Sequence, residues 1–475
     1  MPYTPAVADG PRAVVLAAGQ GTRMRSTLPK MLHPLAGRPL VLHAVGIAAQ
    51  VTGQRPIAVL PPDTPGLTKA VEPHADIAIQ QTPRGSGDAL RSIPAATRPP
   101  SGPVLVLSGD VPLLRAGTLQ ALLDHHSKTN AAATVLTVTP DDPRGLGRIL
   151  RDPRTRKVTA IQEERDIPLG QPANAECNAG VYVFDAQALW PALDRLTPDN
   201  AQAEFYLTDV IALIDGDVEA VEAEDPAEAL GVNDRLQLAQ AAAEIRRRTL
   251  ESLMLNGVTV EDPATTYVEP GVRVGRDTTL KPMTTLAGDT VLGEDCTVGP
   301  MATLSDVRAG NNVRIGPSYL ESCEIGDDVS IGAYVRVRPG TQLERGVQLG
   351  THAEVKNSRI GARSRISHFS AVLDSDVGEE VNIGAGTVTV NYDGVAKHRT
   401  VIGDRAFIGS ASLLVAPRRI GDDAFVAAGS VITEDVPDGA LAVERAEQHN
   451  IEGWSARRRA RAMPGSTSNV GDTNR

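Results

Sequence analysis

A short repeat in the C-terminal half limits the fold more than any other feature of the sequence. Between residues 325 and 428, an aliphatic residue followed by a small one recurs in pairs six positions apart. The pairs are Ile325-Gly326 with Ile331-Gly332, Val377-Gly378 with Ile383-Gly384, Ile402-Gly403 with Ile408-Gly409, and Ile420-Gly421 with Val426-Ala427. This period is too short for a helical repeat and fits one flat face of a parallel β-helix. The alternative is chance alternation in a glycine-rich loop, and four paired occurrences weigh against it.

The repeat divides the chain into a solenoid half and a different front half. A chain of 475 residues exceeds one hydrophobic core, so two domains are expected. Aromatic residues make up only 3% while glycine reaches 44 residues, which suits tight coils. A solenoid coil contacts only its neighbours, so such prisms tend to associate side by side, with binding sites in the grooves between chains.

Composition also limits which partners and which cellular compartment are expected. The net charge of −11 disfavours nucleic acid as a partner but leaves room for phosphorylated small molecules. The sparse cysteines Cys177, Cys296 and Cys323 form neither a disulfide framework nor a zinc motif, which favours a reducing cytoplasm. The N-terminus has no signal-peptide pattern, and no apolar run is long enough for a membrane span.

The front half alternates apolar runs with helical stretches. Strands are predicted at residues 13–17, 57–60, 77–79, 104–107, 133–138 and 181–184. Such alternation indicates a mostly parallel sheet. A helix from about Arg235 to Leu255, ending at Asn256-Gly257, is expected to connect the halves.

Two loops at strand ends contain residues that could bind phosphate groups or Mg²⁺. The first strand leads into Gly19-Gln20-Gly21-Thr22-Arg23, where glycines let backbone N–H groups approach phosphates, although a plain turn is also possible. Arg23 and Lys30 together could neutralise a triphosphate. Asp110 follows the strand at 104–107, where ligands of open α/β sheets bind, and a carboxylate there suits Mg²⁺ as well as a turn.

These motifs resemble a known family. Residues 16–24 (Leu-Ala-Ala-Gly-Gln-Gly-Thr-Arg-Met) with Leu28-Pro29-Lys30 resemble the signature of sugar-nucleotide pyrophosphorylases. Residues 109–112, 206–209 and 231–233, followed by the hexapeptide repeat, narrow the match. The chain, over residues 12–455, is similar to the bacterial bifunctional N-acetylglucosamine-1-phosphate uridylyltransferase / glucosamine-1-phosphate N-acetyltransferase family.

The resemblance implies a fold and two activities. The fold is an α/β nucleotidyltransferase with a Rossmann-like, mostly parallel sheet, followed by a left-handed parallel β-helix of hexapeptide repeats. Together with the predicted helix and repeat, it implies domains at 1–233 and 257–455 and a helical linker at 234–256. From its composition, the basic and polar tail at 456–475 is expected to be disordered, with the arginine run at 457–461 as a solvated helix end. Acetyl-CoA acetylates glucosamine-1-phosphate, and Mg²⁺-dependent transfer from UTP then gives UDP-N-acetylglucosamine and pyrophosphate. This product is a precursor of peptidoglycan and lipopolysaccharide, and the family is a cytoplasmic homotrimer.

The resemblance also implies the nucleotidyltransferase site. Asp110 and Asn233 match the metal ligands, while Lys30 and Arg23 face the phosphates. Gln80, Gly85 and Ser86 match the uracil and ribose side, and Gly147, Glu163 and Asn178 the sugar side. The remaining nucleotide contacts that the resemblance implies are Leu16, Ala17, Ala18, Gly19, Ser108 and Gly109.

The acetyltransferase site is implied within the repeat. Acetyl transfer to an amine needs a base, and His368 matches the family's base, although a lone histidine on a coil is more often structural. Glu354 matches its supporting carboxylate. Arg338, Lys356 and Asn382 match sugar-phosphate contacts, and Ala385, Asn391, Tyr392, Ser410, Ala428 and Arg445 match acetyl-CoA contacts. Residues 391–394 and Lys397 occupy a one-residue slip of the grid and are predicted to protrude.

Three positions depart from the family pattern. Ser108 stands where tyrosine is usual and Asp88 where histidine is usual, and neither is expected to matter much. Ala371 replaces a tyrosine that meets the sugar phosphate, so acceptor affinity is expected to be weaker. This keeps open a monofunctional sugar-1-phosphate nucleotidyltransferase whose β-helix is only a scaffold. The retained Lys30, Asp110 and Asn233 argue against a non-catalytic binding protein.

Overall fold

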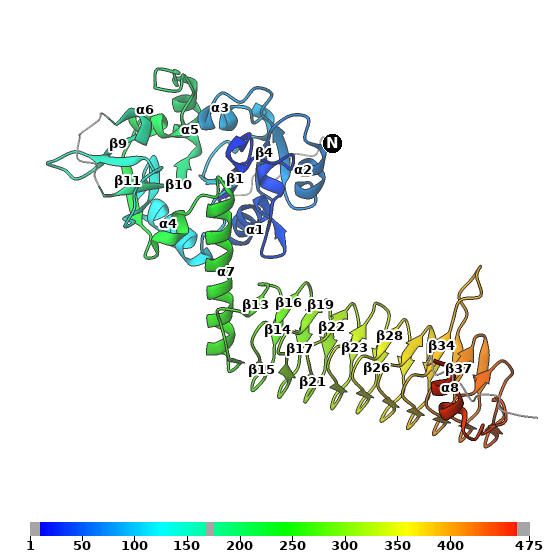
Figure 1. Ribbon diagram of the computed structural model, residues 1–475. Coiled ribbons are helices and arrows are strands. Elements are labelled where there is room, and N and C mark those ends of the chain that lie inside the picture. The colour runs from blue at the N-terminus through cyan, green and yellow to red at the C-terminus, as the bar shows by residue number, and fades with distance from the viewer. Residues whose placement is uncertain (1–9, 168–174, 463–475) are drawn as a thin grey trace, which may run out of the picture. The chain divides into compact units, whose positions relative to one another are not determined.

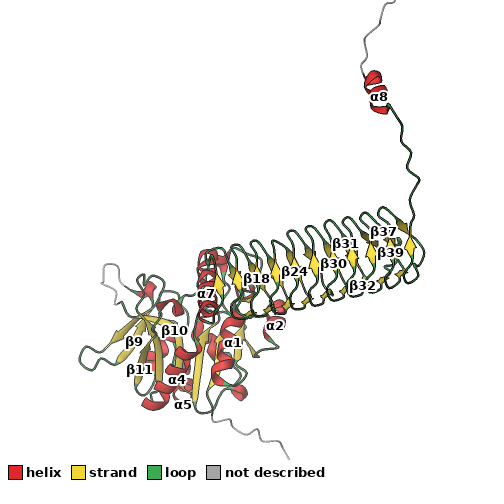
Figure 2. Ribbon diagram, turned by 90° about the horizontal axis from the view of Figure 1, so that it is seen from below, coloured by secondary structure: helices red, strands yellow, loops and turns green. Residues whose placement is uncertain are grey.

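The computed structural model describes residues 10–167 and 175–462, and it contains two compact units (Figures 1 and 2). One unit runs to Val272 and includes Leu286–Gly288, and the other holds Arg273–Thr285 and the chain from Asp289 onward. In the described ranges, no helix combines the length and the apolar character that crossing a membrane requires.

The first unit is built on a nine-stranded sheet with the order β11-β7-β10-β6-β1-β4-β5, and β8 and β9 pair beside β10. Strand β10 is antiparallel to β6 and β7, while the pairs β1–β6, β1–β4, β4–β5 and β7–β11 are parallel. The strands are β1 (Arg12–Leu16), β4 (Ile57–Leu60), β5 (Asp76–Ile79), β6 (Pro103–Ser108), β7 (Ala133–Val138), β8 (Arg148–Arg151), β9 (Val158–Gln162), β10 (Cys177–Asp185) and β11 (Val218–Glu222), with a separate hairpin of β2 (Pro34–Leu35) and β3 (Arg38–Pro39). The predicted mostly parallel sheet is confirmed.

Helices cover both faces of this sheet, which is why its central strands are apolar on both sides. Val15 of β1 packs in a cluster with residues of α1, α2 and α4, whereas Val14 packs in a cluster with residues of α3, α5 and α6. The α-helices are α1 (Val41–Thr52), α2 (Pro65–Val71), α3 (Ser86–Arg91), α4 (Ala116–Thr129), α5 (Ala186–Asp194), α6 (Val210–Leu213), α7 (Arg235–Leu255) and α8 (Trp454–Ala462). The 3-10 turns are η1 (Thr22–Met24), η2 (Lys30–Leu32), η3 (Ala95–Thr97), η4 (Glu164–Asp166), η5 (Leu207–Asp209) and η6 (Pro226–Ala229).

All six predicted strands are present, and the strands that were not predicted lie at the sheet's margin. Strands β4 and β7 have the predicted bounds, and β6 and β10 extend beyond theirs. The sequence analysis did not identify β8, β9 or β11. These strands are short and carry charged or partly exposed residues, so they lack the apolar run that marked the central strands.

The rest of the chain winds into a left-handed parallel β-helix with three sheets, as predicted. Pairing within these sheets is parallel, because each strand pairs with its counterpart in the next coil. The first sheet contains β12 (Thr259–Val260), β15 (Thr279–Leu280), β18 (Thr297–Val298), β21 (Arg314–Ile315), β24 (Ser330–Ile331), β27 (Gln348–Leu349), β30 (Arg365–Ile366), β33 (Asn382–Ile383), β36 (Phe407–Ile408), β39 (Phe425–Val426) and β41 (Leu441–Ala442).

The other two sheets complete each coil. The second contains β13 (Tyr267–Val268), β16 (Thr285–Ala287), β19 (Thr303–Ser305), β22 (Tyr319–Glu321), β25 (Arg336–Val337), β28 (Glu354–Lys356), β31 (Ala371–Leu373), β34 (Val388–Val390), β37 (Leu413–Val415) and β40 (Val431–Ile432). The third contains β14 (Arg273–Val274), β17 (Val291–Leu292), β20 (Arg308–Ala309), β23 (Glu324–Ile325), β26 (Gln342–Leu343), β29 (Arg359–Ile360), β32 (Ser375–Val377), β35 (Thr400–Ile402) and β38 (Arg418–Ile420).

The repeated pairs mark the corner between two of these sheets. The first aliphatic residue of each pair, such as Ile325, ends a strand of the third sheet, and the second, such as Ile331, ends the next strand in the first sheet. Both side chains are buried and stack on their counterparts in the next coil, Leu343 and Leu349. The hexapeptide period therefore produces continuous aliphatic columns inside the prism.

The small residue after each aliphatic one is required by close stacking of the coils. A Cβ added at Gly361 would lie 2.4 Å from the carbonyl carbon of Gly378 in the next coil. Gly361→Ala is therefore expected to lower the stability of the β-helix by about 1–3 kcal/mol through overpacking. Thermal unfolding followed by circular dichroism tests this, with Gly271→Ala as the control, since its nearest obstacle is 3.7 Å away. Equal melting temperatures for the two variants would contradict the stacking explanation.

Three further segments were predicted. Helix α7 has the expected bounds, with the Asp234 carboxylate accepting a hydrogen bond from Gln237 N–H at its N-terminus. Residues 391–398 protrude, and a bridge joins Tyr392 to Lys397; Figure 1 shows a loop projecting beyond the coils near β34. The arginine run lies in the exposed helix α8, in agreement with its interpretation as a solvated helix end, and Arg458 lies over the Trp454 ring. The expected disorder can therefore begin only after Ala462. Residues 463–475 lie outside the described part.

Candidate active sites

The glycine loop after β1 brings Lys30 against the sheet edge. Gly21 has a left-handed backbone with φ of 62°, and a Cβ there would lie 2.3 Å from Lys30 Cβ. Glycine is thus required because the lysine stem passes directly over it. Gly19 has no atom within 4 Å of its missing Cβ position, so the loop is open at that point. The loop is shaped to hold Lys30 on one side and admit a ligand on the other.

Two side-chain oxygens converge on the Lys30 ammonium. Lys30 Nζ donates to Asp110 Oδ2, and to Asn233 Oδ1 at 2.8 Å. Ser108 Oγ donates to Asp110 Oδ1 at 2.6 Å, which fixes the carboxylate. The Lys30 side chain is only 6% exposed, so its charge is held in a poorly hydrated place. The structure therefore brings together Lys30, Asp110 and Asn233, which lie far apart in the sequence.

This donor set fits a divalent cation. A carboxylate oxygen and a carboxamide oxygen that already surround one cation are the ligand types that Mg²⁺ takes, with substrate oxygens completing its shell. Within residues 10–167 and 175–462, no group of three or more histidine, cysteine or acidic side chains could hold a metal alone. A metal here would thus depend on the phosphates of a bound nucleotide.

Lys30 and Asp110 line a cavity of ≈ 610 Å³. The residues predicted to contact the uracil and ribose line the same cavity. Gln80 is buried, and its amide nitrogen donates to Gly85 O at 3.2 Å and to Asp88 Oδ2 at 2.9 Å. Ser86 Oγ accepts a hydrogen bond from Leu207 N–H at 2.9 Å. Asp88, the residue found in place of the family's histidine, thus helps to hold Gln80. Residues predicted for the nucleotide that line this cavity are Leu16, Ala18, Gly19, Lys30, Gln80, Gly85, Ser86, Ser108, Asp110, Glu163 and Asn178.

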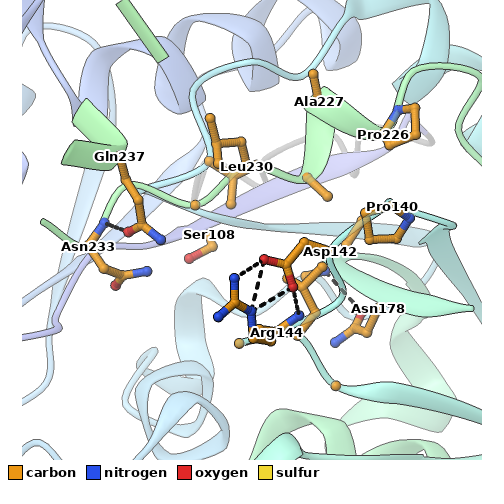
Figure 3. A pocket seen from close by; sticks show the side chains of 18 of the residues that line it. Ser108, Pro140, Asp142, Arg144, Asn178, Pro226, Ala227, Leu230, Asn233 and Gln237 are labelled. Carbon is orange, nitrogen blue, oxygen red and sulfur yellow. Dashed lines mark hydrogen bonds and ion pairs between the residues drawn. The ribbon is translucent and has the colours of Figure 1, made fainter. Parts of the chain in front are cut away.

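A second cavity of ≈ 730 Å³ shares Ser108, Glu163 and Asn178 with the first (Figure 3). Its lining adds three predicted residues, Arg23, Gly147 and Asn233. Asp142 and Arg144 form an ion pair in the view of Figure 3. Of the residues predicted to bind the nucleotide sugar, only Ala17 and Gly109 line neither cavity. A Cβ at Gly109 would lie 3.1 Å from Ala17 Cβ, so these two residues pack the end of β1 against the end of β6.

Glu163 lines both cavities, and its pKa lies above the ordinary value. Burial raises its pKa, the Thr208 hydroxyl that donates to Oε1 at 3.0 Å lowers it, and Asp166 and Asp209 raise it. Because the folded pKa exceeds the unfolded one, this group lowers folding stability as pH rises from below its ordinary value of 4.5 through the folded pKa.

Glu163→Gln is therefore expected to raise the melting temperature at pH 7, and the gain is expected to vanish below about pH 4. The resemblance places Glu163 on the sugar side, so loss of this charged acceptor is expected to lower uridylyl transfer about tenfold. Melting curves at several pH values and an assay of pyrophosphate release check both parts. A variant less stable than the wild type at pH 7 would contradict the assigned burial of charge.

In the β-helix, His368 begins a row of predicted residues along one corner. Backbone hydrogen bonds connect successive coils there: Gly386 N–H donates to His368 O, Ala411 N–H to Ala385 O, and Gly429 N–H to Ser410 O. Arg445 Nη1 then donates to Ala428 O at 3.1 Å. The corner thus aligns His368 with four of the six residues predicted to contact acetyl-CoA, which are Ala385, Ser410, Ala428 and Arg445.

The adjoining face of the second sheet carries charge. Arg338 Nη1 lies 3.0 Å from Glu354 Oε1, and Lys356 Nζ lies 3.9 Å from Asp374 Oδ2. Among the described residues no hydrogen bond joins Glu354 to His368; Thr351 N–H donates to His368 Nδ1 at 3.2 Å. The structure therefore orients the imidazole through the backbone and places Glu354 with Arg338.

The other predicted residues lie on the coils that follow. Ala371 is the register partner of Glu354 on one side and Val388 on the other, so only a methyl group faces outward there. Asn382 begins β33. Tyr392 Oη donates to Gly394 O at 2.7 Å within the protruding hairpin.

Known proteins match both halves. Residues 13–209 match the model of the MobA-like NTP transferase domain, and residues 399–434 that of the hexapeptide repeat of succinyl-transferase. The "Bifunctional protein GlmU" of Mycobacterium marinum is 45% identical over 457 residues, covering 94% of this chain and 93% of that protein. The protein of the same name from Mycolicibacterium paratuberculosis is 46% identical over 466 residues, covering 96% and 94%. The chain belongs to the GlmU family. The predicted bifunctional enzyme, a nucleotidyltransferase domain followed by a hexapeptide acetyltransferase domain, is confirmed.

Several residues of this GlmU site were missed by the sequence analysis. Gln237 Oε1 accepts from Asn233 N–H at 2.8 Å, and Tyr182 Oη accepts from Asn178 Nδ2 at 2.7 Å, so each holds a predicted residue in place. Thr208, which donates to Glu163, lies in the motif at 206–209 and could have been singled out there. No motif in the sequence around Asp374 marked it as a candidate site residue.

Proposed function

We propose that this GlmU family member makes UDP-N-acetylglucosamine in two steps at two separate sites. Acetyl-CoA and glucosamine-1-phosphate react on the β-helix, and UTP reacts with N-acetylglucosamine-1-phosphate at the edge of the sheet. The observation that carries the proposal is the coexistence in one chain of the oxygen pair around Lys30 and the corner row that begins at His368.

In the uridylyl step, an oxygen of the sugar phosphate attacks the α-phosphorus of UTP, and the bond to pyrophosphate breaks. No protein nucleophile is needed, so the residues act by position and charge. Lys30 and Arg23 stabilise the negative charge on the phosphates, while Gln80 and Ser86 orient the base and ribose. Glu163 and Asn178 hold the sugar.

Mg²⁺ is proposed as the metal of this step, held by Asp110 and Asn233. When bound, it supplies positive charge to the reacting phosphates. The support is the convergence of Asp110 Oδ2 and Asn233 Oδ1 on one cation.

In the acetyl step, the amine of glucosamine-1-phosphate attacks the thioester carbon, the C–S bond breaks, and coenzyme A leaves. His368 is proposed to accept the amine proton. Because Nδ1 of the neutral ring accepts a hydrogen bond from Thr351 N–H, the ring's own proton is on Nε2. The amine must therefore take the place of Thr351 N–H as the donor to Nδ1. The hydrogen bond that it displaces is 3.2 Å long, at the long end of the usual range. Arg338 and Lys356 face the phosphate, beside Asn382, and the corner row faces the thioester.

We propose that the chain works as a homotrimer in which neighbouring chains share each acetyltransferase site. A ladder of exposed side chains supports this: Tyr334, His352 and Phe369 stack along one corner, with ring centroids 5.0 and 5.1 Å apart. Tyr334 is 61% and Phe369 68% exposed, which is unusual for aromatic rings in a monomer. A cytoplasmic location is proposed because the three cysteines are free thiols and both donors, UTP and acetyl-CoA, are cytoplasmic metabolites.

Separate assays of the two half-reactions test this function. With UTP, Mg²⁺ and N-acetylglucosamine-1-phosphate, the purified chain is expected to release pyrophosphate. With acetyl-CoA and glucosamine-1-phosphate, it is expected to release free coenzyme A despite Ala371. Pyrophosphate without any coenzyme A would support a nucleotidyltransferase with a scaffold β-helix instead.

A further inference from the structure

A buried carboxylate lies behind the charged face of the β-helix. Asp374 follows β31 with a left-handed backbone, φ of 47°, and its side chain is only 8% exposed. Asn357 Nδ2 donates to Asp374 Oδ1 at 2.6 Å, and Asn391 Nδ2 donates to Oδ2. Asn357 lies one coil before and Asn391 one coil after. The carboxylate is therefore clamped between two carboxamides at one corner of three successive coils.

This clamp holds the root of the protruding hairpin. Asn391 is its first residue, and Asn391 O accepts from His398 N–H at 2.8 Å, which closes the loop. Lys397 lies on the returning strand opposite Tyr392. The position of Lys397 is thus set by the residue that Asp374 binds.

The Lys356 ammonium lies next to this carboxylate, and the charge of Lys397 acts on both groups. Lys356 Nζ is 3.9 Å from Asp374 Oδ2, and the adjacent Lys397 side chain lowers the pKa of Lys356. Burial raises the pKa of Asp374, but its bonds to Asn357 and Asn391 and the two lysine charges outweigh burial and hold it below the usual value. One buried negative charge therefore holds two positive charges that would otherwise repel each other.

We propose that Asp374 is a positioning residue for acetyl transfer: it fixes Asn391 and keeps Lys356 and Lys397 side by side to receive the phosphate of the acceptor sugar. The inference rests on the proposed acetyltransferase function. One carboxylate against two lysines leaves an excess positive charge at this point, and the neighbouring Arg338 is paired with Glu354. The negative charge of a bound phosphate dianion would neutralise this excess positive charge.

Asp374→Asn tests the proposal, because it keeps the shape and removes the charge. The KM for glucosamine-1-phosphate is expected to rise at least about tenfold, because the lysine pair loses its counter-charge. The kcat is expected to fall less than about threefold, because asparagine keeps the side-chain shape that holds Asn391. The matched control is Asp328→Asn. Asp328 is also a corner carboxylate that accepts from a carboxamide of the preceding coil, Asn312 at 2.8 Å, but its charged partner is Arg345. This control is expected to keep the wild-type KM.

The pH dependence separates positioning from a structural role. Without Asp374, the lysine pair is expected to lose a proton at lower pH, so KM begins to rise with pH earlier than in the wild type. Arg338 and Glu354 near Lys356, and Arg399 near Asp374, remain in both proteins. Asn357→Ala, which removes one clamp bond without touching a lysine, is expected to shift KM in the same direction by less.

The outcomes are distinct. A wild-type chain that releases no coenzyme A would overturn the proposed function itself. A wild type that does so, with an Asp374→Asn variant of unchanged KM and pH profile, would overturn this inference alone. If Asp374→Asn fails to fold, as judged by circular dichroism, the Asn357→Ala variant decides: an unchanged KM there also overturns the inference.

Discussion

Replacing His368 with alanine is expected to reduce acetyl transfer by about 10²- to 10⁴-fold, the usual contribution of a general base. The sugar amine is protonated at neutral pH and cannot attack a thioester until it loses a proton. His368 begins the corner row of residues that we assign to acetyl-CoA, and Thr351 N–H orients its ring. Coenzyme A release with glucosamine-1-phosphate is the measurement.

Uridylyl transfer in the same variant provides the control. The Lys30 cluster lies on the α/β sheet, and His368 makes none of its hydrogen bonds. Pyrophosphate release from N-acetylglucosamine-1-phosphate should therefore stay at the wild-type rate. Loss of both activities would mean that the two sites are not independent, and retained acetyl transfer would remove His368 from the reaction.

The reverse separation is expected for Asp110→Asn. Uridylyl transfer should fall about 10²- to 10³-fold, as when one preorganised electrostatic group is removed from a transition state. The variant keeps an oxygen near Lys30 but loses the negative charge that both the ammonium and a divalent cation require. The measurement is pyrophosphate release over a range of Mg²⁺ concentrations, where the variant should need more metal.

Stability must be followed in the same experiment. Lys30 is buried, and leaving a buried charge without its partner is destabilising. Asp142→Asn is the control, because Asp142 lines the neighbouring cavity but pairs with Arg144 and makes no bond to Lys30. Circular dichroism and the melting temperature would show whether the α/β unit of Asp110→Asn is folded, and acetyl transfer should stay normal. Uridylyl transfer at the wild-type rate with unchanged Mg²⁺ dependence would contradict the assigned role of Asp110.

The β-helix could be predicted from sequence because its constraint is local and repeated. Every coil places an aliphatic residue such as Ile383 inward and a small residue such as Gly384 where the next coil passes, so the pattern recurs along the chain. Strands β8, β9 and β11 escaped prediction because they lie off the central strands, and their partly exposed faces carry no continuous apolar run.

Some residues of the candidate sites could be predicted from the sequence alone, some only from the family resemblance, and some not at all. Asp110 stood out because it ends a strongly apolar strand. Its partnership with Asn233 depended on the family resemblance, since Lys30 reaches Asn233 across 203 positions of the chain. Asp374 could not be distinguished in the sequence from other corner acids with left-handed backbones, such as Asp328 and Asp423. Only the packing of neighbouring coils shows which of them is buried between two asparagines.

The most direct test of two successive reactions in one chain is a coupled assay that starts from glucosamine-1-phosphate. UTP and Mg²⁺ are supplied, acetyl-CoA is either present or absent, and coenzyme A and pyrophosphate are measured separately over time. Two sites acting in sequence predict that coenzyme A appears first and that pyrophosphate follows only when acetyl-CoA is present. Pyrophosphate released from glucosamine-1-phosphate without acetyl-CoA, or no coenzyme A under any condition, would contradict the assignment.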